Sequence, residues 1–312
     1  MNPFLAAVAS AQLGAFTARQ AQDAGYSDDE VRAQVRAGRW KSLRRGVYAE
    51  SETVATARTD ANTFHQLLAA AGILALDPGA FISHASGAAL QGMALLTSPG
   101  GVVHTTRPEG PPRHYRGLRV HELPLPAQFR TRYRALPVTT PARTVVDCAA
   151  ILDFPNAVVT CESALFQRLV DPNALWDAFA VLPRRQRRRV ERVIHFSSTK
   201  SESPGESLTR IVFAELGLPD PEQQRGYSDD RGFIGRVDFV WVELGVIAEF
   251  DGEVKYGKGA TVFEEKKRED RLRDLGFEVV RIVWTDLVRD RGDLARRLAA
   301  AFERAARRRR PA

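Results

Sequence analysis

The sequence contains little cysteine: Cys148 and Cys161 are the two among 312 residues. They are far apart in the chain and form no CxxC pair, which excludes a disulfide framework and a zinc site built from cysteines. We therefore expect two buried, reduced thiols in a cytoplasmic protein.

Long apolar runs are also missing. The longest, near Leu67 to Leu76, is too short to span a bilayer. The first residues, MNPFLAAVASA, are similar to the apolar part of a secretion signal, but no Lys or Arg precedes them, which argues against export. We expect no membrane partner. Internal repeats are absent apart from runs of arginine.

Positive charge, in contrast, is abundant and clustered. The net charge is +7 and the isoelectric point is about 9.7. One cluster is PRRQRRR at 183–189, and four arginines follow at 307–310. Clustered arginine favours a polyanionic partner such as DNA, although solvated linkers and tails have the same composition. The length predicts about two domains, with three as an alternative.

The first 55 residues show a helix-turn-helix pattern. Thr17 and Ser27 are followed three positions later by Gln20 and Glu30, so each pair can form a capping box at the start of a helix. A glycine follows each of the two helices and can end it. Two capped helices joined by a short glycine-containing turn are typical of a helix-turn-helix.

The second of these helices carries side chains suited to DNA. Val31 and Val35 are four apart and can face the core, which leaves Arg32, Gln34 and Arg36 pointing elsewhere. Arg and Gln can hydrogen-bond to base edges in the major groove. We predict that these three residues contact DNA. The alternative is a small helical bundle that binds protein.

A basic hairpin, RWKSLRRGVYA, follows at 39–49. It is predicted to form a wing in which Lys41, Arg44 and Arg45 contact phosphates. The stretches GAFTARQAQDAGYS and VRAGRWKSLRRGVYA resemble the winged helix-turn-helix that opens AbiEi family antitoxins of type IV toxin–antitoxin systems. The resemblance implies DNA binding by a domain at 1–55 and a cognate toxin as a partner.

The middle segment, 56–182, alternates helical and strand-like patterns. Helices are predicted at 63–76 and from Pro141, with Thr140 as N-cap, and strands at 101–106 and 118–122. Arg143 and Asp147 are four apart and can pair. SHASGAALQGM and VTTPARTVVDCA resemble the remainder of the same antitoxin family. This implies an α/β scaffold for repression or partner binding rather than catalysis.

A nucleophile in the middle segment is not predicted. Ser83, His84 and Ser86 are adjacent, but no G-x-S-x-G sequence surrounds them. A capping or core role for the histidine is favoured over catalysis.

The last segment contains acidic residues inside strand-forming runs. The runs GFIGRVDFVW (232–241) and VIAEFDG (246–252) are separated by four residues, which suits a hairpin. If Trp241 faces Val246, then Asp238 faces Glu249, and Glu249 shares a face with Asp251. The alternatives are a hairpin that faces water and a shifted register.

Opposed carboxylates destabilise a sheet, and burying them increases the cost. A divalent cation would neutralise the cluster. Mg²⁺ takes oxygen ligands and retains waters for chemistry. We therefore predict a site for Mg²⁺, or Mn²⁺, at Asp238, Glu249 and Asp251.

The order of elements after residue 200 is helix, hairpin, charged helix, strand and helix. This order resembles the PD-(D/E)XK restriction-endonuclease-like fold, and more narrowly a domain-of-unknown-function family related to very-short-patch repair endonucleases. The matching pieces are SPGES, GRVDFVW, IAEFDGEVKYG and EDRLRDLGFEVVRIVWTDL.

The resemblance implies catalytic roles for five residues. Asp238 corresponds to the motif aspartate, Glu249 to the acid of the (D/E)xK pair, and Glu206 to the acid of the first helix. The usual lysine is replaced by Asp251, which puts catalytic competence in doubt. Lys255 could supply the missing positive charge.

The predicted architecture is multidomain α/β and α+β. A winged helix-turn-helix (1–55), an antitoxin-like middle domain (56–182) and a basic linker (183–199) precede a nuclease-like domain (200–312). We predict a DNA-binding, metal-dependent endonuclease acting in defence against mobile DNA or in repair, with Arg268, Arg271 and Arg273 holding the DNA backbone. A solvated helical face is the alternative for those arginines.

Two further interpretations stay open. One is a non-enzymatic, antitoxin-like transcriptional repressor with an inactive nuclease fold. The other is a protein-binding antitoxin whose target is a nucleotidyltransferase-like toxin.

Overall fold

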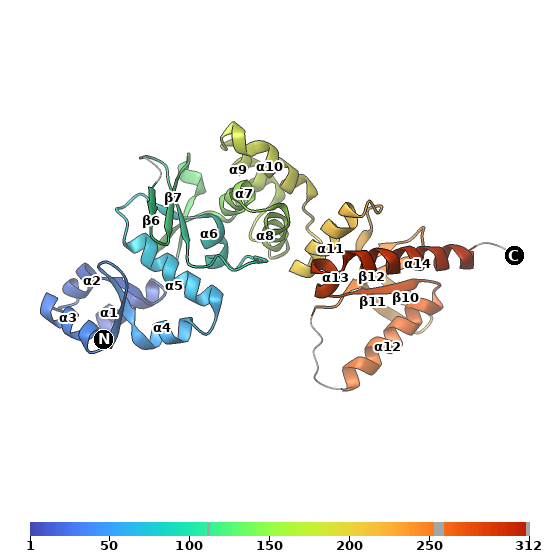
Figure 1. The fold of residues 1–312 in the computed structure, drawn as a ribbon, viewed down its shortest axis with the longest axis horizontal. Coiled ribbons are helices and arrows are strands. Elements are labelled where there is room, and N and C mark those ends of the chain that lie inside the picture. The colour runs from blue at the N-terminus through green and yellow to red at the C-terminus, as the bar shows by residue number, and fades with distance from the viewer. Residues whose placement is uncertain (111–112, 253–258, 310–312) are drawn as a thin grey trace. The chain divides into compact units, whose positions relative to one another are not determined.

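The computed structural model describes residues 1–110, 113–252 and 259–309 (Figure 1). The chain divides into two compact units, Met1–Ser197 and Ser198–Ala312, which we call the N-terminal and C-terminal units. Each unit combines helices with β-sheet, so the chain is a mixed α/β protein with several sheets, as the sequence predicted. No helix within the described ranges is both long and apolar enough to cross a bilayer.

The N-terminal unit opens with short helices and a small antiparallel sheet. These elements are α1 (Pro3–Ala11), β1 (Ala15–Thr17), α2 (Ala18–Asp23), α3 (Asp28–Arg36), β2 (Trp40–Arg44) and β3 (Val47–Glu50). Thr17 and Ser27 form the two predicted capping boxes. The sheet has the order β1-β3-β2, with the β2–β3 hairpin following α3 as a wing. The arrangement is of the winged helix-turn-helix type.

The helices and the wing share one core. Phe16, Val31 and Trp40 are buried in it, and the rings of Phe16 and Trp40 meet edge to face at 4.8 Å. Val35 packs against this core from the same side of α3. The opposite side of α3 is therefore left to solvent.

The middle part of this unit has three helices and a six-stranded mixed sheet. The helices are α4 (Ser51–Ala57), α5 (Ala61–Leu74) and α6 (His84–Leu90). The strands are β4 (Phe81–Ile82), β5 (Val103–Arg107), β6 (Arg113–Tyr115), β7 (Leu118–Glu122), β8 (Arg130–Tyr133) and β9 (Leu136–Thr139), in the order β6-β7-β5-β4-β9-β8. One apolar cluster extends from Ala15 and Val47 of the winged helix to Leu67 and Ile82, so these two parts share a core.

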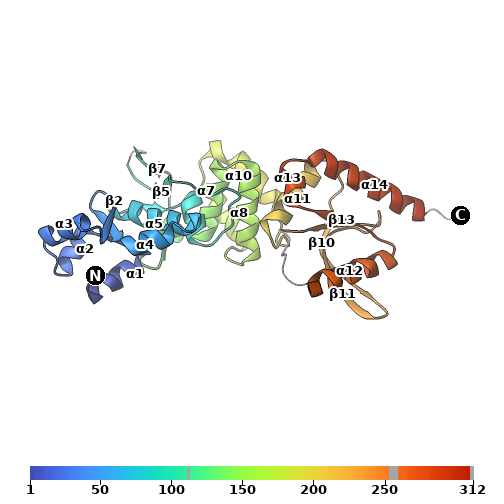
Figure 2. The same ribbon diagram turned by 60° about the horizontal axis from the view of Figure 1, so that its bottom comes forward.

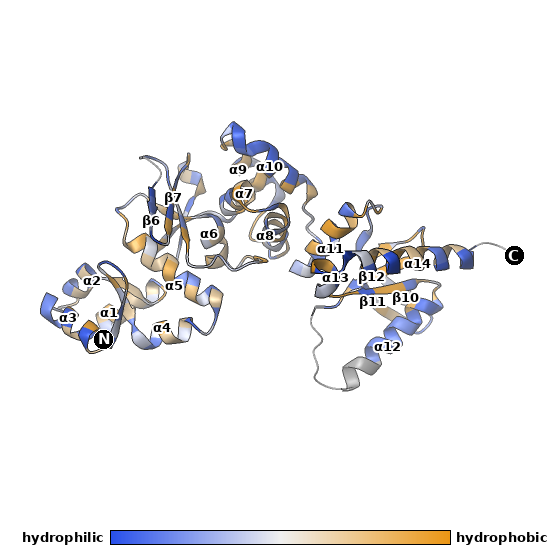
Figure 3. Ribbon diagram, in the orientation of Figure 1, coloured by the Kyte–Doolittle hydropathy of each residue, from blue (hydrophilic) through white to orange (hydrophobic). Residues whose placement is uncertain are grey.

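Four helices complete the unit: α7 (Pro141–Ile151), α8 (Phe154–Phe166), α9 (Pro172–Ala180) and α10 (Arg184–Phe196). Segment 183–199, expected to be a linker, is largely helix α10, which packs on α7, α8 and α9. Val190 and Val193 are buried and give the helix an apolar face, while the arginines make the rest hydrophilic (Figure 3).

Charged and thiol side chains are buried among these helices. The predicted pair of Arg143 and Asp147 forms on α7, with Nε donating to Oδ1 at 2.8 Å and both side chains fully buried. Burial raises the pKa of Asp147 to about 6, although Arg143 opposes the shift. Cys148 and Cys161 are buried, as predicted.

The C-terminal unit is built around a four-stranded sheet. Its elements are α11 (Pro204–Glu215), β10 (Glu222–Asp229), β11 (Gly232–Trp241), β12 (Val246–Phe250), α12 (Gly259–Asp274), β13 (Glu278–Ile282), α13 (Trp284–Val288) and α14 (Arg291–Arg309). The strand order is β10-β11-β12-β13, antiparallel except for the parallel pair β12–β13. Figure 2 shows α12 and α14 on opposite sides of this sheet.

The predicted hairpin register is confirmed. Trp241 pairs with Val246 and Phe239 with Ala248, and Asp238 and Glu249 are the next residues beyond the last of these pairs. Strand β10 was not predicted, because its sequence EQQRGYSD is polar and lacks an apolar alternation.

Candidate functional sites

The exposed side of α3 is a candidate DNA-binding surface. Arg32 and Arg36 are exposed and lie four residues apart, so they share one face of the helix. Arg32 also pairs with Asp29 at 3.1 Å on the surface. Gln34 is half-buried, and its side-chain oxygen accepts a hydrogen bond from Arg39 at 2.6 Å. Of the three predicted base-reading side chains, the two arginines are therefore open to a ligand.

The first turn of α3 is acidic, since it contains Asp28, Asp29 and Glu30. Phosphates would be repelled there, although negative charge at a helix N-terminus stabilises the helix itself. Contacts with DNA would therefore have to come from the second half of α3 and from the wing.

The basic residues of the wing differ in whether their side chains are free to contact DNA phosphates. Lys41 and Arg45 are exposed. Arg44, in contrast, donates hydrogen bonds to the carbonyls of Arg116 and Gly117, at 3.1 and 2.6 Å, beside the β6–β7 turn. Arg44 thus fastens the wing to the six-stranded sheet.

A row of polar side chains crosses the sheet of the C-terminal unit, and we call it the carboxylate row. Glu249 of β12 pairs with Arg281 of β13. Asp238 of β11 lies one residue beyond the Phe239–Ala248 pair, and its side chain accepts a hydrogen bond from Gln224 of β10. Residues in register across a sheet project from the same face. Gln224 was missed in the sequence because β10 was.

Asp238 is the most perturbed member of the row. Its Oδ2 accepts the Phe250 amide at 2.8 Å, and its Oδ1 accepts the Gln224 side-chain amide at 3.3 Å. Burial raises the pKa of Asp238 to about 6, and the charges of Glu206 and Glu249 add to the shift. A nearby positive charge would stabilise the ionised form of this carboxylate.

Glu206 reaches the row from the first turn of α11. Its carboxylate accepts the Gln224 side-chain amide at 2.9 Å, the Ser203 hydroxyl at 2.8 Å and the Glu202 amide at 3.0 Å. Burial raises the pKa of Glu206, and these hydrogen bonds oppose the shift. Glu206 therefore both stabilises the start of α11 and faces Asp238 through Gln224.

Gln224 has an unusual backbone for a strand residue. Its φ is 55°, in the left-handed region that non-glycine residues rarely adopt. This conformation lets one side-chain amide bridge Glu206 and Asp238. Strained residues of this kind concentrate at functional sites.

Glu249 and Asp251 are held by arginines. Arg268 of α12 donates to both oxygens of Glu249, at 3.1 and 2.6 Å, and also to the Arg236 carbonyl. Asp251 accepts from Arg281 at 3.3 Å. The structure thus links Asp238 to Glu206 through the Gln224 amide. Glu249 is paired with Arg268, and Asp251 with Arg281 of β13. Lys255 lies outside the described residues.

A glycine makes room for Arg268. Gly235 has a φ of 149°, and a Cβ at this position would lie 2.7 Å from Nε of Arg268. The guanidinium can therefore lie against β11 while it reaches Glu249.

The other predicted backbone-binding arginines have internal partners. Arg271 donates to Asp229 at 2.7 Å and to the Gly232 carbonyl at 2.9 Å, which closes the β10–β11 turn. Arg273 pairs with Glu269 on α12. Both side chains therefore have structural contacts in this unit.

A family model matches the beginning of the chain. Residues 3–51 match the family described as "Transcriptional regulator, AbiEi antitoxin". This match covers the winged helix-turn-helix and agrees with the predicted resemblance there.

Two curated proteins of Mycobacterium tuberculosis are similar to the chain. They are Uncharacterized protein MT2308 of strain CDC 1551 / Oshkosh and Uncharacterized protein Rv2248 of strain ATCC 25618 / H37Rv, each 33% identical over 170 residues. The match includes 54% of this chain and spans 62% of the length of each relative.

Among solved structures, the crystal structure of RV2827C protein from Mycobacterium tuberculosis aligns with 72% of this chain and 87% of that chain. The sequence identity is 14% and the TM-score is 0.37, a likeness too weak to assign a fold.

Proposed function

We propose that the protein binds DNA through its winged helix-turn-helix and hydrolyses phosphodiester bonds with the carboxylate row of its C-terminal unit. The observation that carries the nuclease part is the half-buried Asp238, which shares the Gln224 amide with Glu206 and whose pKa is raised to about 6 by burial and by the carboxylates of Glu206 and Glu249. A cation bound beside Asp238 would offset the neighbouring negative charges that raise its pKa.

The order of elements supports the same proposal. A helix, three antiparallel strands, a second helix and a fourth strand parallel to the third are the parts expected of a restriction-endonuclease-like domain. Asp238 lies on the second strand and Glu249 on the third, which are the positions that the resemblance assigns to the motif acids.

Asp238 and Glu249 would hold the cation, with Glu206 or Asp251 as a further oxygen ligand. This all-oxygen donor set suits Mg²⁺ or Mn²⁺. When bound, the ion would supply a Lewis acid and a water of lowered pKa. Gln224 would orient Asp238 through the hydrogen bond it donates, and Arg268 would place a fixed positive charge beside the carboxylates, a role usually taken by lysine in such nucleases.

Plasmid cleavage tests the nuclease part. Purified full-length protein is incubated with supercoiled plasmid and Mg²⁺, Mn²⁺ or EDTA, beside Asp238→Asn and Asp230→Asn. Asp230 is an exposed residue of the β10–β11 turn and serves as a matched control. We expect metal-dependent nicking that Asp238→Asn abolishes and Asp230→Asn retains. Equal nicking by both variants would refute the assignment.

DNA binding is tested separately by titrating duplex DNA at several salt concentrations. Each phosphate contact that is lost reduces the slope of log affinity against log salt by about one. We expect weaker binding by Arg32→Ala and Arg36→Ala, and unchanged binding by Arg289→Ala, an exposed arginine of the C-terminal unit. Unchanged DNA affinity of the two α3 variants would show that DNA binds to a different surface of the protein.

A transcriptional regulator without nuclease activity is the second candidate. It is favoured by Arg268, which already neutralises Glu249 with two hydrogen bonds, and by Asp251 at the position of the usual lysine. Intact DNA binding with no cleavage in either metal would select this function. The family of residues 3–51 also suggests a cognate toxin, which would co-purify with the protein from its native host.

A further inference from the structure

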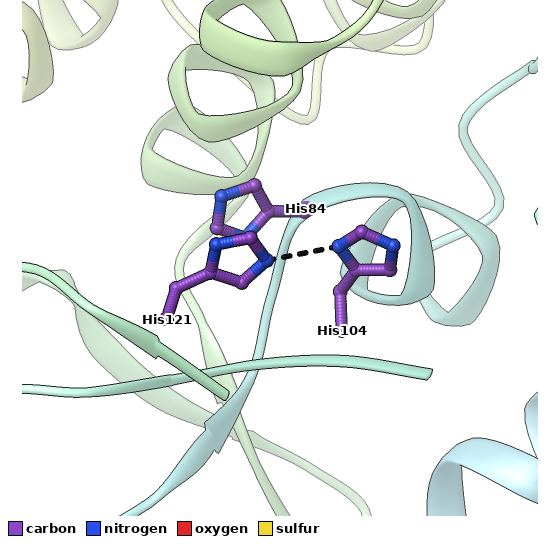
Figure 4. A group of neighbouring side chains, drawn as sticks. All are labelled: His84, His104 and His121. Carbon is purple, nitrogen blue, oxygen red and sulfur yellow. Dashed lines mark hydrogen bonds between the residues drawn. The ribbon is translucent and has the colours of Figure 1, made fainter. Parts of the chain in front are cut away.

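Three histidines from separate elements of the N-terminal unit converge in a histidine cluster: His84, His104 and His121 (Figure 4). Each offers one ring nitrogen, and the three nitrogens all lie within 4.8 Å of one another. His104 lies on β5 and His121 on the adjacent parallel strand β7. Because His121 pairs with Thr106, two positions after His104, both imidazoles project from one face of the sheet.

The nitrogens already approach ligand spacing. Nδ1 of His104 and Nε2 of His121 are 3.0 Å apart. Two nitrogens that each lie about 2.0–2.1 Å from a tetrahedral zinc ion are about 3.4 Å apart. The rings of His84 and His121 stack at 3.9 Å. Rotation of the rings would be needed to turn the three nitrogens toward one point.

His84 has an unsatisfied buried atom. Its side chain is fully buried, and Nε2 has no hydrogen-bond partner among the described residues. Its Nδ1 lies 2.8 Å from the hydroxyl of Ser83, which in turn accepts from Thr106. When Nδ1 donates to Ser83, the lone pair of Nε2 is available, and metal-bound histidines are commonly oriented by such an outer hydrogen bond.

The backbone of His84 is also strained. It starts α6 with a φ of 52°, in the left-handed region. Strain of this kind persists where the surroundings fix the residue, and it concentrates at functional sites. Here it brings an imidazole from the β4–α6 junction against β5 and β7.

The nearby charges allow a cation. Arg143 and Arg119 both place positive charge near His84. Arg143 is paired with the buried Asp147, and Arg119 is exposed to solvent, and both facts weaken the repulsion of a cation. Burial lowers the pKa of His104 to about 4 and that of His121 to about 3, with the neighbouring histidines and Arg119 adding to both shifts.

We propose that His84, His104 and His121 bind one transition-metal ion of the zinc class. Three imidazoles without a thiolate suit Zn²⁺, and three protein ligands leave a fourth position open to water or another ligand. The ion would replace the hydrogen bond between His104 and His121 and tie β5, β7 and α6 together. This site is independent of the carboxylate row and of the proposed phosphodiester hydrolysis.

Calorimetric titration of full-length protein, first freed of metal with a chelator, tests the proposal. Zn²⁺ is added to a background protein with the cluster intact and to the same background with His104→Gln, His121→Gln or His114→Gln. His114 is an exposed histidine of β6 and is the matched control. All four proteins carry Asp238→Asn, so that zinc held by the carboxylate row does not contribute.

We expect one zinc ion per chain, an affinity at least about tenfold lower in each cluster variant, and no change for His114→Gln, since even outer partners of metal ligands contribute that much. Zinc should also raise the unfolding temperature of the background protein but not of His121→Gln. Because His121 is partly exposed, glutamine can be accommodated there. Absence of saturable binding, or equal affinities in cluster and control variants, would overturn the site.

Discussion

Replacing Asp238 with asparagine should stabilise the C-terminal unit at neutral pH. The pKa of Asp238 is raised from 3.8 to about 6 in the folded protein. A raised carboxyl pKa means that stability is greatest below the unfolded pKa and is lost as the pH rises through the folded one. The loss for Asp238 therefore takes place between about pH 4 and pH 6 and is complete above that range.

The size of the effect follows from the shift. Two pKa units correspond to about 3 kcal/mol of unfolding free energy, as an upper estimate. Asparagine keeps an oxygen for the Phe250 amide but cannot accept from Gln224 through its NH₂ group. The loss of that hydrogen bond reduces the gain in unfolding free energy by about 1 kcal/mol. We therefore expect a net gain of about 1–2 kcal/mol at pH 7.5 and none at pH 4.

Hydrogen exchange of peptides from β11 and β12, at both pH values, measures the stability of the C-terminal unit within the full-length protein. Mg²⁺ is then added at pH 7.5. If the carboxylate row binds the ion, the wild type gains protection and the variant does not, whether or not any DNA is cut. A difference between the two proteins that is the same at both pH values would refute the electrostatic reasoning.

Three further substitutions test the packing. Arg143→Ala leaves Asp147 buried without its partner and should cost about 3–5 kcal/mol in urea unfolding; an equally large loss for the double variant with Asp147→Ala would contradict this explanation. Gly235→Ala places a Cβ against Arg268 at a positive φ and should cost about 1–3 kcal/mol, measured by exchange in β11; no change would show that the arginine moves freely. Ser27→Ala removes a capping hydroxyl from α3 and should cost about 1 kcal/mol, read from thermal unfolding beside the exposed surface variant Asp23→Asn.

Features that depend on local chemistry could be predicted from the sequence. The capping boxes at Thr17 and Ser27 fixed the starts of α2 and α3, because the required residues lie three positions apart. The β11–β12 register followed from the length of the turn and the two-residue alternation of the strands. The pairing of Arg143 with Asp147 followed from helical spacing.

Features that depend on residues far apart in the chain could not be predicted from the sequence. Arg44 has the composition of a phosphate ligand, yet its hydrogen bonds go to carbonyls some seventy residues away in sequence. The run at 183–189 has the composition of a linker, yet two buried valines further along α10 anchor that helix. The role of Gln224 depends on a polar strand without an apolar pattern, and Arg268 lies against Gly235 where it reaches Glu249.

The sequence by itself determined a winged helix-turn-helix, an α/β middle part and an acidic hairpin, because capping, alternation and spacing act over a few residues. Only the tertiary structure decided which charges meet. It placed Glu206 and Gln224 beside Asp238, and it brought three histidines from 84, 104 and 121 to one point. Strand pairing and burial join residues that are far apart in the chain, and no local pattern records those contacts.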